Sequence, residues 1–138
     1  MDIPKTAKEQ LAEILAQEAE EERRSRDARE EQAAVEELEK RRLFKQLKET
    51  LGIELQRIDT VAGMVAIKRV SPEVYDQFQR SLVAQAHRIE ANKIVVLAAV
   101  VHPDPDTFSD WCHKFPAIVP SMSAHVIEFA GSEVSKKA

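Results

Sequence analysis

Residues Ser71-Pro72-Glu73-Val74-Tyr75-Asp76-Gln77-Phe78 carry the clearest structural signal in this sequence. A serine followed by proline and glutamate is typical of a helix start. The hydroxyl can cap free N–H groups, proline fits the first helical position, and an acid is favourable in the first turn. Apolar residues follow at spacings of three and four, which predicts one apolar helical face. This face comprises Tyr75, Phe78, Leu82, Ala86 and Ile89.

The helical pattern runs into an apolar segment at residues 92–101, Asn-Lys-Ile-Val-Val-Leu-Ala-Ala-Val-Val. Periodicity alone does not separate a buried strand from the end of a buried helix. Because no turn residue interrupts the preceding pattern, we favour a continued helix, with a strand as the alternative. Residues 102–106 then break the chain with two prolines, and a short aromatic helix and a last helix over about 117–130 are predicted beyond them.

Residues 53–70, upstream of the serine, alternate between apolar and polar side chains. Together with a turn near Asp59–Gly63, this alternation predicts a β-hairpin. A lone hairpin is only marginally stable in water. We therefore expect it to pack on the helices or to pair with another chain.

Residues 5–50 consist mainly of strong helix formers, and neither proline nor glycine occurs between Pro4 and Gly52. One long helix capped by Gly52 is predicted. Its apolar residues form two patches: Leu11, Ile14 and Leu15; and Val35, Leu38, Leu43, Phe44, Leu47 and Leu51. A coiled coil needs apolar a and d positions over several heptads, and residues 18–32 offer only alanines. A solvated arm with an apolar tip is therefore favoured over an imperfect coiled coil or a disordered tail.

These patterns predict an α+β fold that is mostly α. A charged helical arm at 1–52 precedes a compact domain at 53–131, built from one hairpin and a bundle of three to four helices, and a flexible tail follows at 132–138.

The composition argues against several classes of partner and of cellular location. A net charge of -4 and a pI of about 5.6 argue against nucleic acid and against an anionic membrane as partners. A single cysteine, Cys112, excludes an intrachain disulfide and fits a reducing cytosol. The first residues lack a secretory pattern, and the longest apolar run is too short to span a bilayer. We therefore expect a cytoplasmic protein.

Potential metal ligands gather within twelve positions: His102, Asp104, Asp106, Asp110 and His113. Their spacing matches no standard metal site, and aspartates beside prolines are more simply turn formers and helix caps. Cys112 and His113 are adjacent, so on a helix they point about 100° apart and do not form a catalytic pair. No nucleotide-binding or hydrolase motif occurs. The expectation is no enzyme, no metal and no cofactor.

The predicted short helix carries the aromatic residues Phe108, Trp111 and Phe115. Such residues are enriched where proteins bind partners, but they also fill the core of a small domain. Core packing is favoured, and partner contact stays open as the alternative.

The compact domain resembles the tail assembly chaperones of tailed bacteriophages over about residues 53–131. The resemblance rests on a hairpin that ends in Lys68-Arg69-Val70, and on the apolar run from Val95 that ends in Val101-His102-Pro103-Asp104. It also includes Lys114-Phe115-Pro116-Ala117-Ile118 and a closing Ile127-Glu128-Phe129-Ala130-Gly131. Ala117 stands where such proteins often have glycine, and Phe129 where they have leucine. The arm at 5–50 is not matched by the family pattern.

The resemblance implies a chaperone that binds the tape measure protein in the bacterial host cytoplasm and keeps it soluble until the tail tube polymerises. Tail tube subunits and further copies of the chain are implied as additional partners. A structural component of a phage particle, or a coiled-coil adaptor, is the alternative. The apolar residues expected to contact the partner are Leu11, Ile14, Leu15, Trp111 and Phe115.

Overall fold

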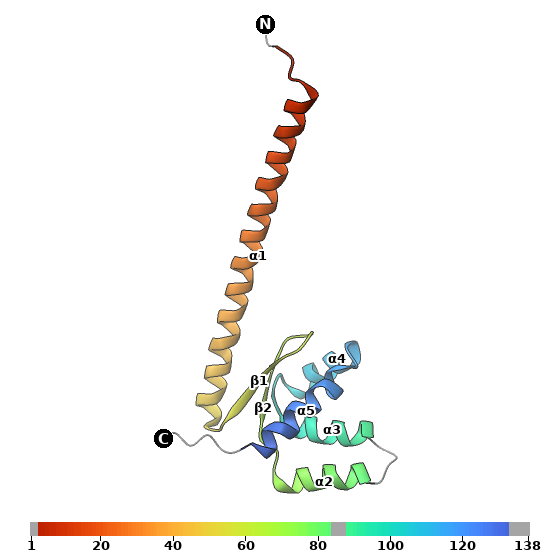
Figure 1. Cartoon of the computed structure of the whole chain (residues 1–138). Coiled ribbons are helices and arrows are strands. Elements are labelled where there is room, and N and C mark those ends of the chain that lie inside the picture. The colour runs from red at the N-terminus through yellow and green to blue at the C-terminus, as the bar shows by residue number, and fades with distance from the viewer. Residues whose placement is uncertain (1–2, 84–87, 133–138) are drawn as a thin grey trace. The chain divides into compact units, whose positions relative to one another are not determined.

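The computed structural model describes residues 3–83 and 88–132. By compactness the chain divides into two units, Met1–Leu43 and Phe44–Ala138. The predicted class is confirmed, since the described residues form five helices and one small antiparallel sheet (Figure 1).

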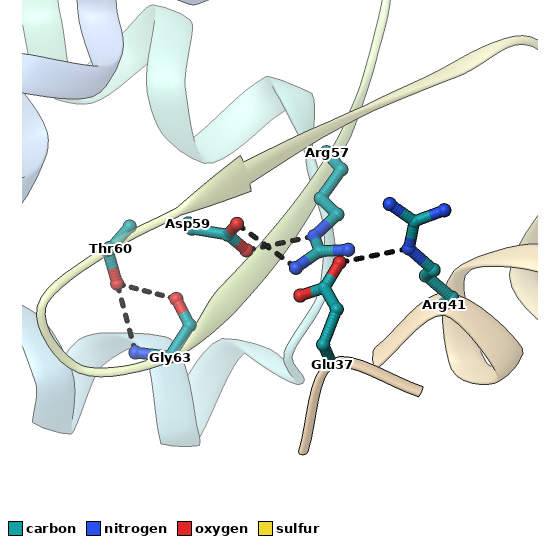
Figure 2. Close-up of polar contacts among 6 residues, drawn as sticks. All are labelled: Glu37, Arg41, Arg57, Asp59, Thr60 and Gly63. Carbon is teal, nitrogen blue, oxygen red and sulfur yellow. Dashed lines mark hydrogen bonds and ion pairs between the residues drawn. The ribbon is translucent and has the colours of Figure 1, made fainter. Parts of the chain in front are cut away.

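Helix α1 (Ala7–Leu51) confirms the predicted helical arm, and none of its residues is buried. Ion pairs one turn apart support it. Glu20 accepts hydrogen bonds from Arg23 and Arg24, and Glu37 accepts one from Arg41 at 3.0 Å (Figure 2). Such pairs add a few tenths of a kcal/mol each, roughly 0.2–0.5. They allow a helix with little apolar surface to persist in water.

Gly52 ends α1 as predicted. Its φ of 65° lies in the left-handed region, and its N–H donates to the Lys48 carbonyl at 2.9 Å. This 5→1 hydrogen bond satisfies one of the carbonyls left without a partner at a helix end.

The predicted hairpin is present as β1 (Leu55–Asp59) and β2 (Met64–Lys68). The prediction of a hairpin alone was incomplete, because β3 (Val100–His102) pairs antiparallel with β2 and makes a sheet of order β1-β2-β3. The apolar segment at 92–101 is therefore helix up to Ala99 and strand beyond it. The third strand supplies, within this chain, pairing that the hairpin needs for stability.

The turn between β1 and β2 is closed by Thr60 (Figure 2). Its hydroxyl donates to the Gly63 carbonyl at 2.7 Å and accepts from the Gly63 N–H at 3.2 Å. Gly63 has a φ of 155°, and a Cβ at this position would lie 2.8 Å from Cη2 of Trp111. Glycine is thus required here by backbone conformation and by the close approach of the indole.

Gly63→Ala should lower the free energy of unfolding by about 1–3 kcal/mol, because alanine is strained at this φ and its methyl group overlaps Trp111. Urea unfolding followed by fluorescence measures the change, since Trp111 is the single tryptophan. Gly131→Ala is the matched control, because a Cβ there would meet nothing within 4 Å. Equal unfolding midpoints for the two variants would contradict the packing described here.

Four helices complete the second unit within the described residues: α2 (Pro72–Val83), α3 (Arg88–Ala99), α4 (Pro105–Lys114) and α5 (Ile118–Gly131). Helix α2 packs on α3, and α5 packs on both α3 and α4 (Figure 1). Their buried faces meet Val65 and Ile67 of the central strand in one hydrophobic core. The largest fully buried side chain of that core is Phe108.

The prediction of one continuous helix from Ser71 to the apolar segment was wrong, because α2 ends at Val83 and α3 begins at Arg88. Packing α3 against α2 buries Phe78 together with Val95 and Val96, which one straight helix could not do. Ile89, assigned by its spacing to the apolar face, is 71% exposed. Ala86 of that predicted face lies outside the described residues, as do residues 133–138 of the predicted tail.

Arg69, just after β2, holds the end of α5. Its guanidinium donates to the Phe129 carbonyl at 2.6 Å and lies 4.5 Å from the centre of the Phe129 ring. It also pairs with Glu54 at 3.0 Å. A cation at a helix C-terminus is favourable, so this residue fixes α5 to the hairpin.

Candidate functional site

The predicted partner residues on the arm share one exposed face. Leu11, Ile14 and Leu15 are 56%, 50% and 55% exposed, and their spacing of three and four places them side by side on α1. These three half-exposed aliphatic side chains form one apolar patch near the N-terminal end of α1, which we call the apolar tip. Whether a partner covers the tip stays a prediction.

The other two predicted partner residues lie in the second unit, on and just after α4. Trp111 and Phe115 are both half-buried and pack against the hydrophobic core. Trp111 also contacts the hairpin turn at Gly63. Most of each ring therefore has a structural role, in line with the favoured interpretation, and only their exposed edges remain for a partner. The five predicted residues thus form two groups, one in each unit.

A groove in the second unit was not predicted. It has a volume of about 590 Å³ and lies between α3, α4 and the start of α5. Phe108 and Val119 are buried beneath it, whereas Ile89 and Leu97 on α3 are 71% and 57% exposed. The remaining lining residues are Asn92, Lys93, Ser109, Cys112, His113, Pro116 and Pro120.

The sequence held one signal for this groove. Ile89, Lys93 and Leu97 are spaced by four residues, which predicts a stripe along one helix face. The same spacing also aligns Ile89 with the apolar face of the preceding helix, and that assignment conceals the stripe. Spacing identifies residues that share a face, but it does not tell which face the rest of the fold covers.

The charge of the groove is one-sided. Among the described residues that line it none is acidic, while Lys93 is cationic. Burial raises the pKa of the Cys112 thiol, and the nearby Lys93 charge opposes this only in part. The thiol is therefore protonated near neutral pH and is a poor nucleophile. The groove is suited to bind an apolar surface that carries negative charge.

The potential metal ligands at 102–113 are used differently. Asp104 caps α4, accepting hydrogen bonds from the Thr107 N–H at 3.1 Å and the Thr107 hydroxyl at 2.7 Å. These bonds hold the pKa of the Asp104 carboxyl below its usual range. The interpretation of this aspartate as a helix cap is confirmed. Over residues 3–83 and 88–132, no three His, Cys, Asp or Glu side chains come together as a metal site would require.

His102, in β3, should make folding pH-dependent. Partial burial lowers its pKa below the usual 6.5, although the Asp104 charge opposes the shift. The unfolded chain therefore binds this proton more readily, and stability should fall as the pH drops below about 6.5. Thermal unfolding at pH 7.5 and pH 5.5 tests this, and His102→Gln should shrink the difference. His125→Gln, at an exposed histidine, is the control; an equal effect of both changes would exclude His102 as the cause.

None of the helices in the described ranges is long and apolar enough to cross a membrane. Comparison of the chain with protein-family models, with curated proteins and with solved structures finds no match.

Proposed function

We propose that this chain is a tail assembly chaperone of a tailed bacteriophage, which binds the tape measure protein and keeps it soluble until the tail tube polymerises around it. The proposal draws its identity from the resemblance over residues 53–131. The observation that carries a binding role is the apolar tip of α1, where Leu11, Ile14 and Leu15 are each at least half exposed. Contiguous exposed apolar patches are a feature of protein–protein contact surfaces, and this supports a binding role for the tip.

The proposed partner is itself a long helical protein with apolar faces that would aggregate before assembly. An amphipathic helix such as the tip of α1 can cover such a face, helix against helix. The rest of the arm is charged, with ion pairs along its surface such as those at Glu20 and Glu37. Many copies bound along the tape measure protein would thus cover its apolar face and expose their own charged surface to water. The role requires no covalent step and takes place in the host cytoplasm.

Co-expression tests this function. This chain would be co-expressed with the longest nearby open reading frame of its source genome that encodes a mainly helical protein. The solubility of that long protein and its co-purification with this chain would then be measured. We expect the long protein to be soluble only in the presence of this chain and to carry many copies of it. A long protein that stays insoluble would overturn the proposal.

The second candidate is a structural component of a phage particle or a coiled-coil adaptor. The observation in its favour is the second exposed apolar pair on α1, Val35 and Leu38, which are 40% and 48% exposed. Permanent packing of the arm on a neighbour would cover this pair as well as the tip. Mass spectrometry of purified particles distinguishes the two roles, because a chaperone leaves before completion and a component remains.

A further inference from the structure

We infer that the apolar tip of α1 from a second copy of this chain docks into the groove between α3, α4 and α5. The inference rests on the two surfaces themselves and not on the proposed function. Both are apolar and exposed in the single chain, and their charges are opposite. The sequence itself therefore contains a segment, the apolar tip, whose apolar side chains and charge are complementary to the groove.

The apolar match is direct. The groove offers Ile89 and Leu97, both more than half exposed, above a floor that includes Phe108. A helix with adjacent aliphatic side chains on one face is the shape that such a groove binds. Leu11, Ile14 and Leu15 form such a face and are exposed to a similar degree. Docking would remove two apolar surfaces from water in one step.

Charge favours one direction of docking. Glu18 lies three residues after Leu15 and four after Ile14, and Glu22 lies four after Glu18. These acids therefore continue the same side of α1 and give the tip negative charge at its C-terminal end. The described lining of the groove carries Lys93 and no acid. Opposite charges at the rim steer association and fix its register. The same charges disfavour groove-to-groove and tip-to-tip contacts between copies.

The arrangement has a consequence for assembly. The tip and the groove are different surfaces, so the contact is heterologous: two copies can exchange tips in a closed pair, or successive copies can form a chain. Self-association would keep both apolar surfaces covered, because each tip would lie in the groove of another copy.

Crosslinking in the full-length protein at mildly alkaline pH tests the inference, because the single cysteine, Cys112, lines the groove and burial raises the pKa of its thiol. Ala7→Cys adds a thiol one turn before Leu11 on the same side of α1 and removes no charge. Ala28→Cys adds the same thiol far from the tip and is the matched control. With a short bis-maleimide we expect roughly tenfold more intermolecular crosslinking for Ala7→Cys than for Ala28→Cys, and peptide mapping should join position 7 to Cys112.

Two further variants sharpen the result. Lys93→Glu should reduce the crosslink to position 7, and combining it with Glu18→Lys and Glu22→Lys should restore it. Recovery of this kind cannot arise from misfolding. A chain that is monomeric by light scattering at high concentration would overturn the inference, as would equal crosslinking of the two cysteine variants. Because only this chain is used, neither failure bears on the co-expression result.

Discussion

Phe108→Ala should lower the free energy of unfolding of the second unit (Phe44–Ala138) by about 3–5 kcal/mol. This is the usual cost of removing a large aromatic side chain from a packed core. Phe108 is 1% exposed and is the largest fully buried side chain in the described residues. A domain of this size has a total stability of only about 5–15 kcal/mol. The variant should therefore be partly unfolded at moderate temperature and lose the floor of the groove.

Urea unfolding measures this effect through the fluorescence of Trp111, which lies on the same helix as Phe108. Phe44→Ala is the matched control, since Phe44 is half-buried on α1 with Lys48 5.0 Å from the centre of its ring. It should cost less than half as much as Phe108→Ala. Equal losses in the two variants would mean that Phe108 is not the central residue of the core.

Features that depend on neighbouring residues could be predicted from the sequence. The start of α2 follows from Ser71 and Pro72, because capping and a fixed φ act within one turn. Gly52 ends α1 for the same kind of reason, through its own φ and a single hydrogen bond to Lys48. The hairpin turn is also local, since Thr60 and Gly63 close it between them.

Features that depend on distant residues could not be predicted. The strand at Val100–His102 is defined by pairing with β2, more than thirty residues earlier in the chain. The division of the expected helix into α2 and α3 reflects the joint burial of Phe78 and Val95. Neither event leaves a mark in local periodicity, because the stabilising contacts form only when the chain has folded back on itself.

The candidate sites likewise differ in whether they depend on neighbouring or on distant residues. The tip of α1 was predicted because its residues are adjacent on one helix. The groove was not predicted, because Ile89 on α3 and Cys112 on α4 come together only in the folded unit. Trp111 is a third case: its residue type is compatible with core packing and with partner contact, and its approach to Gly63 explains its position without a partner.

Leu11→Asp combined with Leu15→Asp should weaken association through the tip at least about 100-fold, while the compact unit stays folded. Fully burying an exposed leucine contributes roughly 1.5–3 kcal/mol. Because Leu11 and Leu15 are 56% and 55% exposed, docking would bury about half of each side chain, so the two lost contacts together cost about 1.5–3 kcal/mol, close to the roughly 2.8 kcal/mol of a hundredfold change. An aspartate carried into an apolar groove adds a desolvation penalty. Both positions are exposed on α1, so the single chain should lose little stability.

Val35→Asp combined with Leu38→Asp is the matched control, because it makes the same change of charge at the other exposed apolar pair of α1. Circular dichroism should show equal helix content in the two double variants. Light scattering and co-purification with the long helical partner then report association. If only the tip variant loses association, the contact is local to Leu11 and Leu15; if both lose it equally, added negative charge is the cause and the tip is not the binding surface. A tip variant that still associates like the unmodified chain would exclude Leu11 and Leu15 from the interface.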